Sequence, residues 1–171
     1  MKALFVNGSP RKGWNTHRML ESARMSDAII IGAPVYYGYA SAQCRAFLER
    51  LMFAAGTYLV DGDGKAVRKF TRVIPTAMIY TMNCPESLAE KVHYPVLLGI
   101  NVEYLRDIFG YSEMLCAYDT YQFSDYSRYA MNLFREEDKA KWRDEHFPED
   151  VRKAYELGKR LIEKAKFQQE G

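Results

Sequence analysis

Cysteine is scarce in this sequence, which has three, Cys44, Cys84 and Cys116, spread over 171 residues. An odd number at wide spacing predicts neither a disulfide framework nor a metal site, so we interpret each cysteine as a small buried hydrophobic residue. Long apolar runs are also missing, since none reaches the roughly 18 residues of a membrane span. The opening residues MKALFVNGSP lack the apolar region and cleavage site of a signal peptide. We therefore expect a cytoplasmic protein without a membrane partner.

Neither sign of charge is in large excess. The chain has 24 Lys and Arg against 22 Asp and Glu, a net charge of +2, so a strongly basic surface for nucleic acid is not expected. With 48% hydrophobic and 27% charged residues, the composition is typical of a globular protein. Repeats and linkers are also absent, and we expect a single domain over residues 1–171.

Short apolar runs alternate with helical patterns along the chain. Strands are predicted at 2–7, 28–33, 73–82 and 113–117, with Pro75 weakening the first half of the third. Helices are predicted after Asn15 and Thr16, from Ser41, over 101–109 and from Pro148. The helix from Pro148 carries an apolar stripe of Val151, Ala154, Tyr155, Gly158, Leu161, Ile162 and Ala165. This alternation predicts an α/β fold, a doubly wound parallel sheet with helices on both faces.

The first bend of the chain, VNGSPRKGWNT at 6–16, has the composition of an anion-binding loop. It is not a Walker A loop, because Trp14 stands where the lysine must be, and it is not a dinucleotide fingerprint, because Pro10 replaces the second glycine. Hydroxyl and amide groups around a helix start suit a monophosphate ester. The candidate residues are Ser9, Arg11, Asn15 and Thr16. A plain turn followed by a helix cap is the alternative.

Two further loops follow predicted strands and are expected at the same edge of the sheet. GAPVYYG at 32–38 offers backbone N–H groups and flat side chains to a planar ring, with Pro34, Val35, Tyr36, Tyr37 and Gly38 as candidates. TMNCP at 81–85 contains Asn83, which is a candidate for the ring's carbonyl and imide edge or simply a turn residue. DGDG at 61–64 is interpreted as a tight turn, because Arg72 stands where a calcium loop needs an acidic residue.

Together, the first two loops resemble the NADPH-dependent FMN reductase and iron-sulfur flavoprotein branch of the flavodoxin-like superfamily. The family pattern G-S-P-R-x-x-x-N-T is matched by residues 8–11 with 15–16, and P-V-Y-x-G by residues 34–38. The resemblance is strong over about residues 1–54. It implies that the first loop holds the FMN phosphate and that the second lies along the isoalloxazine ring.

The same resemblance implies electron transfer from NAD(P)H through bound FMN to a small acceptor such as a quinone or a flavin. Flavin carries this chemistry, so we assign no catalytic side chain and no metal ligand. One alternative is a flavodoxin-type electron carrier, but the resemblance implies that such carriers are strongly acidic, whereas this chain has a net charge of +2. Another alternative is an iron-sulfur flavoprotein, whose compact cysteine motif is not visible here. Family members are commonly dimers or tetramers, so a homodimer or homotetramer is expected.

Aromatic residues are concentrated in the region of Asp119 to Trp142, which reads YDTYQFSDYSRYAMNLF from Tyr118 and then continues to Trp142. A solvated loop does not need so many. One interpretation is a segment that covers the domain, and the other is a subunit interface or a lid over the flavin.

The connection between the first two strands is shorter than the resemblance implies. Met19–Ala23 reads as a first helix still in progress, whereas Arg24–Ala28 reads as the end of a later helix, and no stop signal separates them. The second strand of the flavodoxin-like fold is therefore missing from this sequence. We favour a missing stretch near Ala23 and Arg24, which would reopen the iron-sulfur alternative, over a direct crossover in a four-stranded minimal fold.

Overall fold

The computed structural model describes residues 2–7, 27–69, 71–123 and 125–166. None of the helices in these ranges is long and apolar enough to cross a membrane. In chain order the elements are β1 (Ala3–Asn7), β2 (Ala28–Tyr36), β3 (Tyr39–Ala40), α2 (Ala42–Ala55), β4 (Thr76–Thr81), α3 (Glu86–Lys91), α4 (Tyr94–Phe109), β5 (Ser112–Ala117), the 3-10 helix η1 (Tyr126–Arg128) and α5 (Glu136–Lys166).

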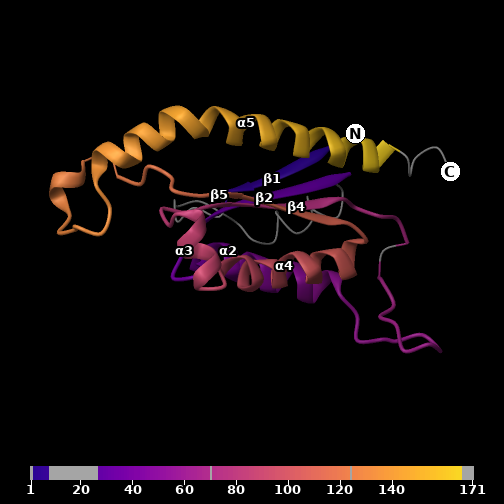
Figure 1. Cartoon of the computed structure of the whole chain (residues 1–171). Coiled ribbons are helices and arrows are strands. Elements are labelled where there is room, and N and C mark those ends of the chain that lie inside the picture. Colours follow the sequence, from indigo (N-terminus) through magenta and orange to yellow (C-terminus); the bar gives the residue numbers. More distant parts are fainter. Residues whose placement is uncertain (1, 8–26, 70, 124, 167–171) are drawn as a thin grey trace.

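The sheet has the strand order β1-β2-β4-β5, and each neighbouring pair is parallel. Helix α5 covers one face, while α2, α3 and α4 lie on the other (Figure 1). In the flavodoxin-like order 2-1-3-4-5, these strands take the places of strands 1, 3, 4 and 5. Within the described ranges, no strand takes the second place, beyond β1. The predicted doubly wound α/β fold is confirmed.

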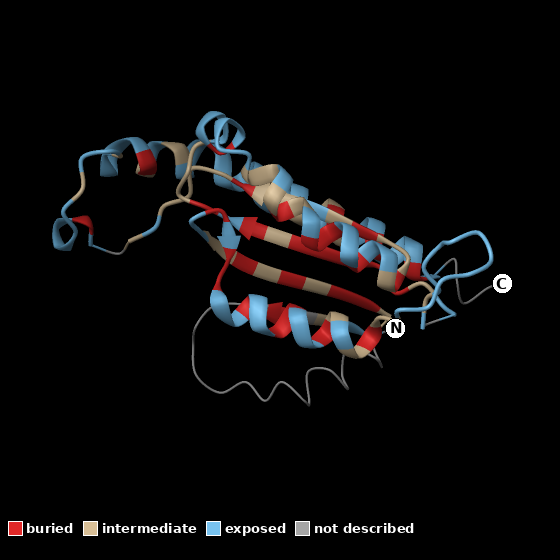
Figure 2. Ribbon diagram, turned by 90° about the horizontal axis from the view of Figure 1, so that it is seen from below, coloured by how far each residue is buried: buried red, intermediate tan, exposed pale blue. Residues whose placement is uncertain are grey.

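Two hydrophobic cores lie on opposite faces of the sheet, because successive side chains of a strand point to opposite faces. In β2, Ile29 and Ile31 belong to the larger core, shared with α2 and α4. Ala28 belongs to the smaller core, where Leu157 and Leu161 of α5 pack against the sheet. Figure 2 shows the consequence, with buried residues on the inner sides of the layers and exposed residues on the outer sides of the helices.

Helix α2 confirms the predicted spacing of apolar residues after Ser41. The Ser41 hydroxyl accepts a hydrogen bond from the backbone N–H of Cys44 at 3.4 Å, so Ser41 caps the helix. The predicted apolar face is buried at Cys44, Phe47, Leu48 and Leu51, and Met52 is partly buried.

Helix α4 is longer than the prediction of 101–109. It begins at Tyr94, with Pro95 in its first turn, and follows His93 in the left-handed conformation with φ 60°. Proline in the first turn is a helix-start signal that the sequence interpretation overlooked. The helix ends at Gly110, whose φ of 90° is the left-handed conformation that favours glycine.

The predicted start of the last helix at Pro148 is wrong. Helix α5 begins at Glu136, and Pro148 lies inside it with its side chain exposed. The acidic first turn, Glu136 to Asp138, suits the positive end of the helix dipole. Glu149 and Asp150 are also acidic and directly follow Pro148, so acidic residues alone do not distinguish the two positions.

The predicted apolar stripe of this helix is only partly correct. Val151 and Tyr155 are exposed, at 53% and 66%. Leu161 and Ala165 of the predicted stripe are buried, and Leu157 is buried beside them. Leu157 was not part of the predicted stripe.

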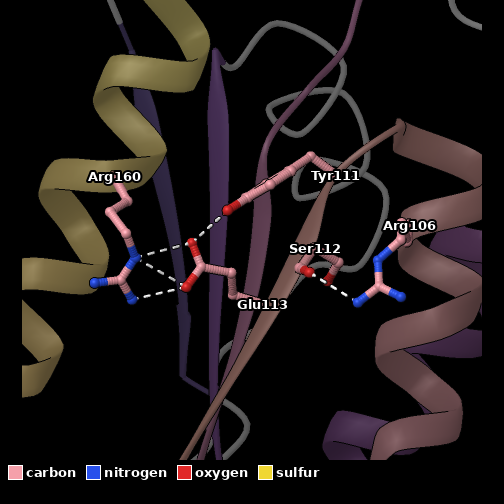
Figure 3. A network of polar contacts seen from close by, with 5 residues as sticks. All are labelled: Arg106, Tyr111, Ser112, Glu113 and Arg160. Carbon is pink, nitrogen blue, oxygen red and sulfur yellow. Dashed lines mark hydrogen bonds and ion pairs between the residues drawn. The ribbon is translucent and has the colours of Figure 1, made fainter.

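An ion-pair network joins α5 to β5 near the amino end of that strand (Figure 3). Arg160 donates to the Glu113 carboxylate at 2.7 and 3.0 Å, and the Tyr111 hydroxyl donates to it at 2.7 Å. Burial disfavours the charged carboxylate, but the hydrogen bonds from Arg160 and Tyr111 outweigh burial and lower the pKa of Glu113. From the opposite face of the sheet, Arg106 of α4 donates to the Ser112 carbonyl at 3.3 Å.

The DGDG segment forms the predicted tight turn. The Asp61 carboxylate accepts the backbone N–H groups of Asp63 and Lys65, both at 2.9 Å. Val60 and Ala66 form an isolated antiparallel bridge that closes the turn.

Candidate functional site

Three described strands end side by side. The register places Pro34 of β2 beside Thr81 of β4, and Thr81 beside Ala117 of β5. The β2–β3 turn, the segment around Asn83 and the segment after β5 all leave the sheet at this edge. In open α/β sheets, ligands bind outside the carboxyl ends of the strands. This edge is therefore the candidate functional site.

The β2–β3 turn is a two-residue hairpin loop. Tyr36 pairs with Tyr39, and the central residues Tyr37 and Gly38 both have positive φ, 52° and 86°, as in a type I′ turn. Tyr36 is 48% exposed and Tyr37 is 94% exposed. The hairpin thus presents two aromatic rings at the edge of the sheet.

Little side-chain surface is offered to the candidate site by Pro34, Val35 and Gly38. A Cβ placed on Gly38 would lie 2.9 Å from the Tyr94 ring of α4. A side chain at Gly38 would therefore crowd helix α4. Val35 packs against the larger core and Pro34 is partly buried in β2, so neither side chain is free to contact a ligand broadly.

Asn83 has a backbone carbonyl that is already hydrogen-bonded and a side-chain oxygen that is not. Its Oδ1 atom is buried and has no hydrogen-bond partner within the described ranges. A buried amide oxygen without a partner costs free energy, about 1–3 kcal/mol. The arrangement fits a ligand that donates an N–H group to Asn83.

Lys139 of α5 is a site residue that sequence reasoning missed. Its side chain is only 3% exposed, and its ammonium group contacts the Asp119 carboxylate and the Asn83 carbonyl oxygen. The ammonium also lies 4.2 Å from the centre of the Phe134 ring. Lys139 therefore links α5 to the segments that follow β4 and β5.

Backbone hydrogen bonds join the same two segments. The Asp119 N–H donates to the Cys84 carbonyl at 3.0 Å, and the Thr120 N–H donates to the Met82 carbonyl at 2.9 Å. Asp119 has a φ of 56°, a left-handed conformation that aspartate tolerates better than most residues. Burial raises the pKa of the Cys84 thiol, and the nearby Lys139 only partly opposes this.

The predicted phosphate-binding residues Ser9, Arg11, Asn15 and Thr16 lie outside the described residues, as does the proposed gap near Ala23 and Arg24. The register still shows where the first loop begins. Asn7, the last residue of β1, lies beside Gly32 of β2, two residues before Pro34. The chain therefore leaves β1 at the same edge of the sheet as the other loops.

The aromatic segment before α5 extends beyond the sheet together with the first turns of that helix (Figures 1 and 2). Its rings pack on one another: Phe123 stacks on Tyr129 at 3.9 Å, and Tyr126 lies 5.0 Å from Tyr121. A cavity of about 210 Å³ lies between this segment and α5, lined by Tyr118, Thr120, Tyr121, Trp142, Arg143, Phe147 and Asp150. The aromatic segment therefore lies beyond the end of the sheet, and does not cover the hydrophobic core.

The cysteines give no sign of a redox or metal centre in the described ranges. All three are free, and no group of three His, Cys, Asp or Glu residues there is arranged to hold a metal ion. Burial raises the pKa of Cys44 to about 11. Cys44 is buried as expected, whereas Cys84 and Cys116 are only partly buried.

Comparison with known proteins adds a likeness of fold. No family model matches the chain, and no curated protein matches it. Thirteen chains of solved structures match. One is the crystal structure of a protein described as NADPH-quinone reductase from P. pentosaceus, at 12% sequence identity and a TM-score of 0.48, with 98% of each chain covered. At that identity and TM-score the likeness carries no argument about function. The parallel α/β arrangement is seen directly in the strand order of the described sheet.

Proposed function

We propose that this protein is an FMN-dependent oxidoreductase that passes electrons from NAD(P)H to a small acceptor such as a quinone or a flavin. The observation that carries the proposal is the buried, unpartnered Oδ1 atom of Asn83 at the carboxyl edge of the sheet. The pyrimidine edge of a flavin has an imide N–H group, which is the donor that this oxygen lacks. The exposed rings of Tyr36, at the end of the neighbouring strand β2, and of Tyr37, in the turn that follows, supply flat surfaces at the same edge.

The described residues would bind and orient the cofactor. Asn83 would accept the imide proton in a hydrogen bond, and the hairpin of β2 and β3 would flank the ring. When bound, FMN supplies the redox chemistry, including acceptance of hydride from a nicotinamide. No side-chain acid, base or nucleophile is required, so we propose no catalytic residue. The sequence assigns the phosphate to Ser9, Arg11, Asn15 and Thr16.

Titration of purified protein with FMN tests the proposal. Asn83→Leu removes the acceptor at similar volume, and we expect it to weaken FMN binding by roughly tenfold, about 1.4 kcal/mol. Asn132→Leu makes the same change at an exposed residue and should leave affinity unchanged. Arg11→Ala should weaken binding by about 1–3 kcal/mol if the guanidinium contacts the phosphate. Failure of the wild-type protein to bind FMN would refute the function.

Turnover assays separate the remaining classes. Oxidation of NADPH or NADH with a panel of quinones, nitro compounds and flavins, and without a partner protein, is expected of a reductase. FMN binding without any turnover would indicate an electron carrier instead. Iron and sulfide in the purified protein would indicate an iron-sulfur flavoprotein.

We also propose that the protein is a homodimer or homotetramer. The aromatic extension before α5 supports this, because Tyr129 and Leu133 are 51% and 74% exposed there and aromatic residues are enriched in interface cores. Sedimentation velocity is the test. A monomer alone at micromolar concentration would contradict it.

A further inference from the structure

A buried cation lies at the edge of the sheet where the proposed flavin site is located. The Lys139 side chain is 3% exposed, while its ion-pair partner Asp119 is 18% exposed. Lysine is almost never fully buried without a partner, and moving an ammonium group out of water costs several kcal/mol. The contacts of the ammonium group with the Asp119 carboxylate and the Asn83 carbonyl oxygen offset this cost. These two residues lie in the segments after β5 and after β4.

The ammonium group is connected to Asn83 directly. Lys139 donates to the Asn83 carbonyl oxygen, and the same residue carries the unpartnered Oδ1 atom. Lys139 therefore holds the backbone from which that side chain projects. Asp119 holds Lys139 in turn, and its own backbone is tied to Cys84, the residue after Asn83. Lys139 and Asp119 form one unit, which we call the Lys139 clip, and it is attached to the segment that carries Asn83.

The Lys139 ammonium contacts the backbone carbonyl of Asn83, so the charges of the clip belong to the same part of the site as the Asn83 side chain. In a partly buried setting, with an effective dielectric constant of about 20, unit charges about 10 Å apart still interact by about 1–2 kcal/mol. Reduction of a flavin adds negative charge to its pyrimidine side. A cation nearby therefore favours the reduced flavin, and an anion nearby favours the oxidised flavin.

We propose that the Lys139 clip positions Asn83 against the flavin and sets the reduction potential of the bound flavin. This inference rests on the proposed function and deepens it. Lys139 and Asp119 act as positioning residues, because they reach the flavin only through Asn83 and through their charges. The two charges have opposite effects: Lys139 raises the potential, and Asp119 lowers it.

The test is the midpoint potential of the FMN-loaded protein, measured by equilibration with reference dyes. Lys139→Met keeps the length of the side chain and removes the cation, so we expect the potential to fall. Asp119→Asn keeps the volume and the tolerance of a left-handed φ, so we expect the potential to rise. A tenfold change in the affinity of reduced over oxidised FMN corresponds to about 30 mV for a two-electron couple, and we expect a shift of about this size in each direction.

A matched pair of variants serves as the control. Glu113→Gln and Arg160→Met break an ion pair between the same helix and β5, near the amino end of that strand. We expect both proteins to keep the wild-type potential. A loss of stability alone would move all four variants in the same way, whereas the proposal requires opposite shifts from the two clip residues.

Each outcome decides between the proposals. Opposite shifts with unchanged controls support the clip. Shifts of the same sign, or no shift, in a protein that retains FMN overturn the clip but leave the proposed function standing. If Lys139→Met does not fold, Asp119→Asn decides alone, and a potential that does not rise overturns the inference. A wild-type protein that binds no FMN overturns both.

Discussion

At Gly38, the addition of a single methyl group has a predictable effect on the free energy of unfolding. Its φ is +86°, and a Cβ there would lie 2.9 and 3.2 Å from two ring carbons of Tyr94. Gly64 has a similar φ of +78° but nothing within 4 Å of an added Cβ. Both glycines therefore have the same backbone requirement, and only Gly38 also has a steric one.

The two requirements give different magnitudes. A residue other than glycine in the left-handed conformation costs roughly 1–2 kcal/mol, and the smaller entropy of the unfolded chain returns about 0.4–1 kcal/mol. Gly64→Ala should therefore reduce the unfolding free energy by about 1 kcal/mol. Overpacking adds about 1–3 kcal/mol, so Gly38→Ala should reduce it by about 2–4 kcal/mol.

Urea unfolding followed by circular dichroism measures both variants. In a Tyr94→Ala background the steric part disappears, because the nearest remaining contact is Leu97 at 3.4 Å. We expect the cost of Gly38→Ala to fall there to that of Gly64→Ala. Equal costs for the two single variants in the wild-type background would refute the reasoning, and so would an unchanged cost of Gly38→Ala without the Tyr94 ring.

Three further changes have defined outcomes in the same unfolding assay. The pKa of Glu113 is lowered in the folded protein, so its ion pair with Arg160 stabilises the fold above a pH of about 4.3 and is lost as the pH falls below that value. Glu113→Gln should reduce the free energy of unfolding by about 1 kcal/mol at pH 7 and weaken its dependence on pH in the acid range. An unchanged dependence of this free energy on pH contradicts this. Tyr80→Phe removes the hydroxyl that accepts from Asn101 at 3.2 Å, and should cost about 1–2 kcal/mol. Pro148→Ala should raise the unfolding free energy by about 1–3 kcal/mol, and an unchanged urea midpoint would show that the proline is not strained.

The strands were predictable because their signals are local. Residues 28–33 form a β-branched run ended by Pro34, and the structure has β2 over these residues and on to Tyr36. Pro75 weakened the first half of 73–82, and β4 begins directly after it, at Thr76. Alternation of these strands with helices was enough to predict a doubly wound sheet.

The candidate site was predictable in its loops but not in its contacts. Tyr36, Tyr37 and Asn83 were predicted at the carboxyl edge because their loops directly follow predicted strands. The contact between Gly38 and Tyr94 joins residues far apart in the sequence, and no local pattern indicates it. The unpartnered state of Asn83 Oδ1 likewise depends on everything packed around it. Such properties belong to tertiary packing, which propensity and spacing do not encode.

The burial of Lys139 follows from the helical periodicity of α5, but the predicted start at Pro148 left Lys139 outside the helix. With 3.6 residues per turn, about five full turns separate Lys139 from Leu157, so both lie on the same side of the helix, and both are buried. Pro148 lies midway, about two and a half turns from each, and therefore on the opposite side, where its side chain is exposed. Proline has no N–H group for the carbonyl four residues before it, and on the exposed side of the helix that carbonyl can bind water. Because the proline faces solvent, the helix can continue through it. One continuous helix thus packs Leu157 into the core between α5 and the sheet and carries Lys139 to the segments at the carboxyl edge.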